Sequence, residues 1–232
     1  PTTIDTFYTN SEGYLITPEV LPYGEYSLVE VQAPYGYALD KTPVAFSVSS
    51  ENAEKENSLT IVKVVKQNTA QKGKISVQKT GDIFTSVATA SSAYTNENGE
   101  MIVNPTTYTP VFADGDLSGA VFQITAKEDI VTADGTIRAY AGDVVSEITT
   151  DENGYAETEP LYLGKYEVRE TKAPYGYVLN NKPKDVELTY AGQEFEVRDT
   201  VNTAFENEYQ GVRISLSKVM ENDEKFGISE EE

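Results

Sequence analysis

Two similar stretches of the sequence place a glutamate on the apolar face of an expected β-strand. Residues 166–177 read YEVRETKAPYGY, and residues 26–37 read YSLVEVQAPYGY. Alternate side chains of a strand lie on one face, so Glu170 and Glu30 share a face with the apolar residues two and four positions earlier. A carboxylate is costly to bury unless it is protonated or paired. The pattern therefore predicts a partner for each glutamate in the core.

A lysine and an asparagine are in phase with the apolar residues of two other expected strands. Lys79 ends the alternating run KISVQK, and Asn207 follows Phe205 by two residues. A buried Lys alone loses its proton, and a buried Glu alone gains one. Brought together with a carboxamide, these groups suggest a reaction: the neutral Lys79 amine attacks the Asn207 side-chain carbonyl, and ammonia leaves. Protonated Glu170 is expected to polarise that carbonyl and to shuttle the proton.

Each of these residues also has a simpler interpretation. A Lys at a strand end is usually a solvated residue that prevents edge-to-edge pairing of sheets. A Glu in an apolar alternation is often a surface residue out of phase, and an Asn favours turns. The repeat favours the joint interpretation. Glu30 and Asn68 recur in register, and the spacing from Asn68 to Lys79 equals that from Asn207 to Lys218.

The composition excludes several kinds of chemistry. The chain has 232 residues and a formal net charge of -20, which argues against nucleic acid or an anionic membrane as a partner. Without Cys or His it has no thiol catalysis, no Ser-His-Asp chemistry and no disulfides. Residues 151–154, DENG, are interpreted as a hairpin turn rather than a calcium loop. We expect no metal, no cofactor and no turnover enzyme.

An internal repeat predicts the domain organisation. Sixteen Tyr and short runs separated by Gly, Pro and Asn predict an all-β chain. The pattern of residues 1–72 returns about 140 residues later, the size of one β-sandwich domain with an insertion. We expect the C-terminal part of a first domain at 1–72, a complete domain at 73–211 and the first strand of a following domain at 212–232. Residues 83–116, rich in Ser, Thr, Ala and Asn, are expected to form a long inserted loop.

Three of these strings carry a family resemblance. YEVRETKAPYGY, together with LSGAVF at residues 117–122 and FEN at residues 205–207, resembles CnaB-type (SpaA-type, prealbumin-like) domains of Gram-positive surface proteins and pilins. The resemblance spans nearly the whole chain and implies tandem Ig-like β-sandwich domains. It also implies a spontaneous intramolecular isopeptide bond, with Lys79 and Asn207 as the joined residues and Glu170 as the promoter.

The first domain matches the family pattern less completely. Only Glu30 and Asn68 match, and Lys66 breaks the inward apolar phase two residues before Asn68. The opening strand of this domain is absent upstream, whereas a similar strand, residues 212–218, occurs at the other end. One hypothesis is that this strand fills the gap in the first domain of another chain and brings Lys218 to Asn68. The alternative is that both ends are cut from a longer protein.

The expected function is structural. We expect a stalk or backbone module of a Gram-positive cell-surface adhesin or fimbria, extracellular and cell wall-anchored. Its expected partners are the neighbouring domains of the same surface protein, with host extracellular matrix as a further candidate and without membrane insertion. The alternative is a ligand-binding adhesin domain that recognises a host protein or glycan through residues 83–116, although the absence of Trp argues against a sugar platform.

Overall fold

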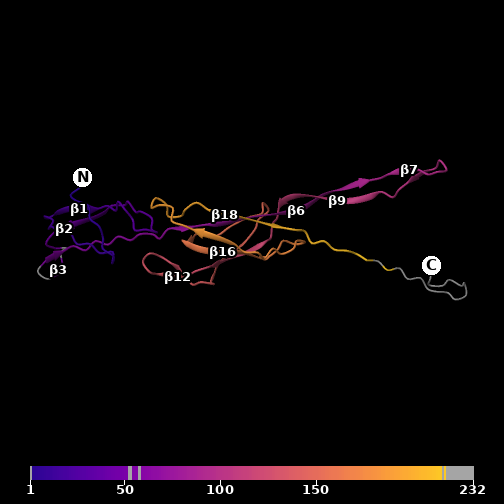
Figure 1. The fold of residues 1–232 in the computed structure, drawn as a ribbon. Coiled ribbons are helices and arrows are strands. Elements are labelled where there is room, and N and C mark those ends of the chain that lie inside the picture. The colour runs from indigo at the N-terminus through magenta and orange to yellow at the C-terminus, as the bar shows by residue number, and fades with distance from the viewer. Residues whose placement is uncertain (1, 52–53, 57–58, 216, 218–232) are drawn as a thin grey trace.

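The chain folds into strands. The computed structural model describes residues 2–51, 54–56, 59–215 and 217, and within them every regular element is a β-strand (Figure 1). No helix of these residues has the length and apolar character needed to cross a membrane. The prediction of an all-β chain is confirmed.

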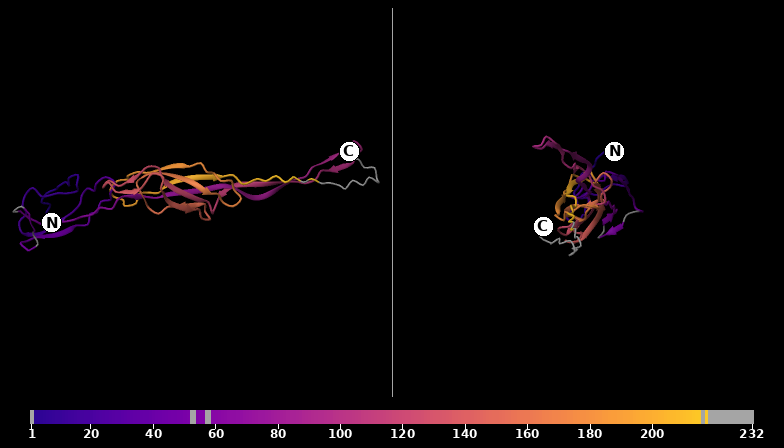
Figure 2. Two further views of the ribbon diagram at one scale, coloured as in Figure 1. Left: turned by 90° about the horizontal axis from the view of Figure 1, so that it is seen from below. Right: turned by 90° about the vertical axis from the view of Figure 1, so that its right-hand side faces the viewer.

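The molecule is elongated. We refer to residues 1–72 as the first module and to residues 73–211 as the second module, following the division expected from the repeat. The first module lies at one end and the second in the middle, and a thin ribbon and residues 208–215 leave from the far end of the second module (Figures 1 and 2).

One sheet of the second module contains four antiparallel strands in the order β13-β10-β16-β17. Their bounds are Val144–Thr149 (β13), Val121–Ala126 (β10), Gly164–Lys172 (β16) and Lys184–Leu188 (β17). Burial alternates along β16, where Tyr166, Val168 and Glu170 are buried and Arg169 is exposed. The alternation predicted for the glutamate strand is therefore present.

The facing sheet is built around β6, in the order β14-β6-β18, with β9 pairing along the outer part of β6. The bounds are Ile75–Ala90 (β6), Thr107–Asp116 (β9), Tyr155–Glu157 (β14) and Val201–Asn207 (β18). β18 runs parallel to β6. The first long strand and the last strand of the second module are thus direct neighbours.

The core lies between these two sheets. Phe122 of β10 and Phe205 of β18 come from opposite sheets, and their ring centroids lie 4.8 Å apart. Each fully buried apolar side chain of this kind contributes about 1.5–3 kcal/mol to stability. The fully buried apolar side chains from both sheets include Ile75, Val77, Phe122, Ile124 and Val168.

The remaining strands form short antiparallel pairs. They are β1 (Gly24–Leu28) with β2 (Val44–Val48), β3 (Glu54–Glu56) with β4 (Leu59–Ile61), β5 (Lys72–Gly73) with β15 (Leu161–Tyr162), β7 (Ala93–Thr95) with β8 (Met101–Val103), and β11 (Ile130–Val131) with β12 (Ile137–Ala139). Of these, β1 and β2 are the first-module counterparts of β16 and β17.

The repeat extends to individual hydrogen bonds. The Tyr26 hydroxyl donates to the carbonyl four residues earlier at 2.8 Å, and the Tyr166 hydroxyl does the same at 2.6 Å. The two modules differ in how the inner face of this sheet is covered. Leu28 of β1 is 36% exposed, whereas its counterpart Val168 is 0% exposed. Among the described residues, the inner face of β1 and β2 is therefore only partly covered, whereas the second module has a facing sheet.

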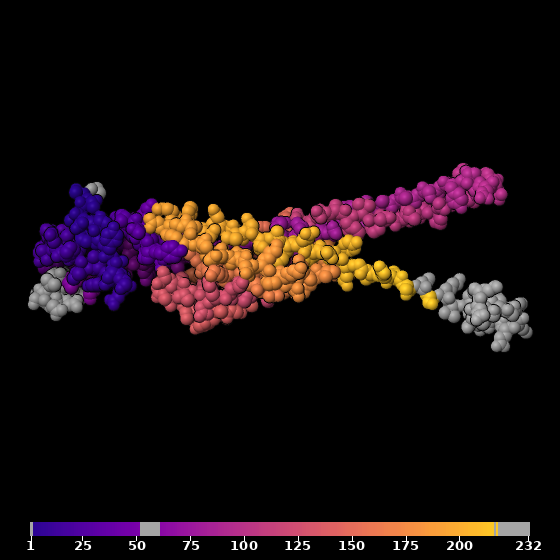
Figure 3. Space-filling view, viewed as in Figure 1, coloured from indigo at the N-terminus to yellow at the C-terminus, as the bar shows by residue number. Residues whose placement is uncertain are grey.

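Residues 83–116 form a β-ribbon, so the expectation of a loop is wrong. β6 continues outward and pairs with β9 from Thr80 opposite Asp116 to Ala90 opposite Thr107, and β7 and β8 pair beyond them. The ribbon projects as a thin arm from the body (Figure 3). Its side chains are mostly exposed, so it lacks the apolar alternation by which a half-buried strand is identified in a sequence.

Candidate crosslinking site

Lys79, Glu170 and Asn207 meet in the core of the second module. They lie on β6, β16 and β18, and their exposed fractions are 0%, 1% and 3%. The Lys79 Nζ donates to Asn207 Oδ1 at 2.5 Å, and Asn207 Nδ2 donates to Glu170 Oε1 at 3.0 Å. The Lys79 Nζ also lies 3.8 Å from Glu170 Oε1. An amine, a carboxyl group and a carboxamide thus form a closed triangle away from solvent.

Strand register brings these side chains together. β18 pairs with β6 so that Phe205 lies opposite Lys79, two residues before Asn207. On the other sheet, Phe122 lies opposite Glu170. The Phe122 and Phe205 rings, in contact across the core, form an apolar wall beside the polar groups. Such surroundings strengthen hydrogen bonds within the site and disfavour an isolated charge.

Glu170 lies on the nitrogen side of the Asn207 amide. Its Oε1 accepts from Asn207 Nδ2, and its Oε2 accepts from the Asn180 N–H at 2.8 Å. Lys79, rather than Glu170, contacts the carbonyl oxygen. The expected polarisation of the carbonyl by Glu170 therefore has no contact in this arrangement. Glu170 Oε1 therefore bonds to the amide nitrogen and lies 3.8 Å from the Lys79 amine, which is the arrangement that a proton shuttle between the two nitrogens requires on its nitrogen side.

The surroundings favour the neutral form of Lys79. Burial lowers the pKa of the Lys79 ammonium below its usual value, and the attraction of Glu170 opposes part of that shift. Repulsion from Lys184 on β17 lowers the pKa of Lys79 further. The Lys184 Nζ lies 4.8 Å from the centroid of the Phe205 ring and donates to the Ala204 carbonyl. A neutral amine is the nucleophilic form, so these effects favour attack.

Two glycines that the sequence does not assign to the site support it. The Gly154 carbonyl accepts the Lys79 N–H at 2.7 Å, and Gly154 has a φ of 67°, in the left-handed region that favours glycine. Gly81 lies opposite Asn207, and a Cβ there would come within 2.7 Å of Leu117 Cδ1. The turn pattern around Gly154 signals a turn glycine, but only the tertiary structure shows its contact with Lys79.

Glu30 and Asn68 form a similar pair without a lysine. Asn68 Nδ2 donates to Glu30 Oε1 at 2.9 Å and to Oε2 at 2.8 Å. The Asp40 N–H donates to Glu30 Oε2 at 3.1 Å, as the Asn180 N–H does to Glu170. No lysine bonds to Asn68 in the part of the chain that the structure describes. The two residues therefore make up a half-site.

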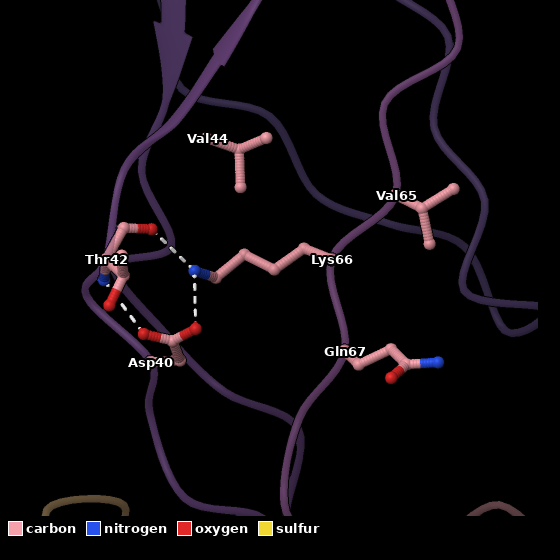
Figure 4. A pocket seen from close by; sticks show the side chains of 6 residues that line it. All are labelled: Asp40, Thr42, Val44, Val65, Lys66 and Gln67. Carbon is pink, nitrogen blue, oxygen red and sulfur yellow. Dashed lines mark hydrogen bonds and ion pairs between the residues drawn. The ribbon is translucent and has the colours of Figure 1, made fainter.

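Lys66 is engaged elsewhere in the first module (Figure 4). Its Nζ donates to Asp40 Oδ2 at 2.9 Å and to the Thr42 carbonyl at 2.7 Å, and its side chain is only 11% exposed. Hydrogen bonds from Thr42 and then from Lys66 lower the pKa of Asp40 to about 2. Lys66 therefore occupies a position of the apolar alternation because its ammonium group is paired with Asp40. It does not supply the missing amine of the half-site.

Lys218 lies outside the described residues, so the structure does not place it. Within those residues, no group of three or more Asp or Glu side chains is arranged to hold a metal ion. The three residues expected in the complete domain are brought together, and the two expected in the first domain are brought together.

The chain belongs to the SpaA family of prealbumin-like fold domains. The model of that family matches residues 2–64 and 112–203, more than half of the chain. The matched ranges include Glu30 and Glu170, while Lys79 and Asn207 lie outside them. The match shows the family and the fold, and the site rests on the geometry described above.

Several known proteins are similar to this chain. The trypsin-resistant surface T6 protein of Streptococcus pyogenes serotype M6 is 31% identical over 80 residues, which cover 34% of this chain and 14% of that protein. The Bacillus anthracis TIE protein has 25% identity and a TM-score of 0.47 over 82% of this chain and 26% of its own. A minor pilin of Streptococcus agalactiae has 16% identity and a TM-score of 0.36 over 82% of this chain and 66% of its own. The chain spans a small part of the first two proteins.

Proposed function

We propose that the chain is a structural stalk or backbone module of a Gram-positive cell-surface adhesin or fimbria, stabilised by a self-formed isopeptide bond between Lys79 and Asn207 that Glu170 promotes. The observation that carries this proposal is the buried 2.5 Å contact between Lys79 Nζ and Asn207 Oδ1, with Glu170 within reach of both partners. Holding two groups in a reactive arrangement raises their effective concentration to roughly 10⁵–10⁸ M. A slow reaction between an amine and an amide thereby becomes accessible.

The proposed reaction balances with these three residues alone. A proton passes from the Lys79 ammonium to the Glu170 carboxylate, and the neutral amine attacks Asn207 Cγ. The Nζ–Cγ bond forms, the Cγ–Nδ2 bond breaks, and Glu170 relays a proton from Nζ to Nδ2, so that ammonia leaves. The remaining proton stays on Glu170. Lys79 and Asn207 are consumed, so the reaction takes place once per chain and the protein is not a turnover enzyme.

The position of the bond suits a load-bearing module. β6 opens the second module, and β18 closes it as the parallel neighbour of β6. A bond between Lys79 and Asn207 joins these two strands directly. Tension that enters at β6 then passes through the bond and leaves after β18. The intervening segment, whose ends are 128 positions apart in the sequence, carries little load.

Pulling on single molecules from both ends tests this function. In the crosslinked chain, the segment between Lys79 and Asn207 is expected to release no length at any force that leaves covalent bonds intact. In Lys79→Met, unfolding of the second module is expected to release on the order of 400 Å, because an extended chain spans about 3.3–3.6 Å per residue. Release of that length by the unmodified protein would exclude a load-bearing crosslink.

Location and partners follow from the same proposal. We propose that the chain is extracellular and cell wall-anchored, and that its main partners are neighbouring modules of the same surface protein. Family membership and the partial similarity to a streptococcal surface protein support this location. Host extracellular matrix is a second candidate partner.

We further propose that the half-site of the first module accepts an opening strand. Residues 62–68 lie in no assigned strand, and their even-numbered residues are the less exposed ones. We propose that this alternating segment pairs with a donor strand, as open strand edges do. If residues 212–218 of a second chain serve as the donor, Lys218 reaches Asn68.

Denaturing gels test the donor-strand hypothesis. Concentrated protein is expected to form multimers that survive boiling and that are lost in both Lys218→Ala and Asn68→Ala. Lys182→Ala, which changes an exposed lysine elsewhere, is the matched control and is expected to keep the multimers. A single monomer band at high protein concentration would contradict the hypothesis.

The ribbon supports a second candidate function, binding of a host protein. It carries exposed large side chains near its outer end, where Tyr94 is 56%, Met101 73% and Tyr108 70% exposed. Exposed apolar side chains of this kind mark interaction sites when they are contiguous. A variant in which a short turn joins Phe84 to Phe112, in place of residues 85–111, distinguishes the two functions. It is expected to lose host-protein binding and to keep the crosslink.

A further inference from the structure

The two modules are joined by a buried glutamine. Gln71, at the end of the first module, is 1% exposed. Its Nε2 donates to the carbonyls of Gly192 at 2.8 Å and Phe195 at 2.7 Å, and its Oε1 accepts the Ala191 N–H at 2.8 Å. All three partners belong to the loop at residues 190–195 of the second module. This joint loop surrounds the glutamine amide and satisfies it with backbone groups.

The joint loop also packs on the APYGY turn of the first module. The rings of Tyr35 and Tyr190 lie 4.6 Å apart. The Ala33 N–H donates to Gln193 Oε1 at 2.9 Å, and the Leu39 N–H donates to the Gln193 carbonyl at 2.8 Å. The contacts hold one end of the first module against the start of the second, as the adjoining surfaces in Figure 3 show.

The far end of the second module repeats the same local structure. The Gln71 N–H donates to the Gly36 carbonyl at 2.8 Å, and the Gln210 N–H donates to the Gly176 carbonyl at 2.7 Å. A second pair of bonds is repeated as well. The Ala38 N–H donates to the Thr69 carbonyl at 2.9 Å, and the Val178 N–H donates to the Glu208 carbonyl at 2.9 Å. The backbone that presents Gln71 to the joint loop is therefore rebuilt around Gln210.

This second end is uncovered. Gln210 is exposed, and its side chain makes no hydrogen bond within the described residues. Val178 is 52% exposed, whereas its counterpart Ala38 is 6% exposed. Tyr175 is 103% exposed, whereas its counterpart Tyr35, whose ring contacts Tyr190 in the first joint, is 74% exposed. We refer to Tyr175, Val178, Leu179 and Gln210 as the tail surface.

We propose that the tail surface is the docking site of a further module of the same family, whose loop corresponding to residues 190–195 surrounds Gln210. The continuation of the chain supports this occupant. Residues 213–218 read RISLSK and follow Gln210 at the spacing at which KISVQK, residues 74–79, follows Gln71. The sequence that follows the first joint and opens the second module is thus repeated after the tail surface. The inference does not depend on the crosslink.

A longer chain tests the proposal. Residues 1–218 are followed by a second copy of residues 80–210, so that the natural tail opens the added module and the added loop has the sequence that surrounds Gln71. The chain has no Cys. Spin labels on cysteines placed at Glu152 and at its copy therefore report the distance between the two modules across the new joint, and labels at Glu25 and Glu152 report it across the existing joint.

Both joints are expected to give narrow distance distributions. Gln210→Ala and Tyr175→Ala should widen the distribution across the new joint about twofold or more, because modules without a fixed interface move freely about their linker, and they should leave the existing joint unchanged. Gln71→Ala is the matched control and should do the reverse. Resistance of the added residues to protease checks that they fold. A distribution across the new joint that is broad from the start, and unchanged by Gln210→Ala, would overturn the proposal.

Discussion

Replacement of Glu170 by glutamine is expected to leave Lys79 and Asn207 unjoined in a folded chain. Glutamine keeps the volume of the side chain but cannot take a proton from the amine and pass it to the departing nitrogen. General acid-base catalysis contributes about 10²–10⁴-fold to the rate of such steps. Intact mass, followed over time after purification, measures the fraction of chains that have lost ammonia.

A neighbouring glutamate offers the matched control. Glu167 lies on the same strand as Glu170 but is partly exposed, and it bonds to Arg169 rather than to the site. Glu167→Gln is expected to form the bond as the unmodified protein does. Complete loss of ammonia in Glu170→Gln would show that the proton relay is assigned to the wrong residue.

Removal of the crosslink is expected to lower the free energy of unfolding of the second module by about 5 kcal/mol, the loop-entropy value for joining residues separated by 128 positions. The variant for this comparison is Lys79→Met with Glu170→Gln, which leaves no unpaired buried charge. Guanidinium unfolding of the variant and of the crosslinked chain measures the difference.

A second lysine on the approach to β6 provides the control for stability. Lys74 is partly exposed and pairs with Glu157 at 2.6 Å. Lys74→Met is expected to cost at most about 1 kcal/mol, as exposed ion pairs usually do. If the double variant unfolded at the same denaturant concentration as the unmodified protein, the crosslink would be absent or would contribute nothing.

The residues of the site could be predicted because strand parity is a local property. Lys79, Glu170 and Asn207 each follow apolar residues at a spacing of two, so each was assigned to the inner face without knowledge of the fold. The direction of the Asn207 amide could not be predicted in this way. It depends on which partner each end of the amide meets, and the structure places Lys79 at the oxygen and Glu170 at the nitrogen.

The features that the sequence did not reveal depend on contacts between distant segments. Gln71 resembles any polar residue of a linker, and only the loop around Gly192 makes it a buried one. Gly154 was identified as part of a turn, whereas its bond to Lys79 comes from strand pairing. The strands of the ribbon at residues 83–116 cannot be identified from the sequence, because exposed strands without a buried face have no apolar alternation.

The intact mass of the purified full chain tests the central claim most directly. One bond between Lys79 and Asn207 expels one ammonia, so the measured mass is expected to lie about 17 Da below the mass of the sequence. A single such loss is expected for the isolated monomer, because Asn68 has no lysine partner among the described residues. Fragmentation should then yield a branched peptide that joins Lys79 to Asn207. A folded protein whose mass equals that of its sequence would contradict the account.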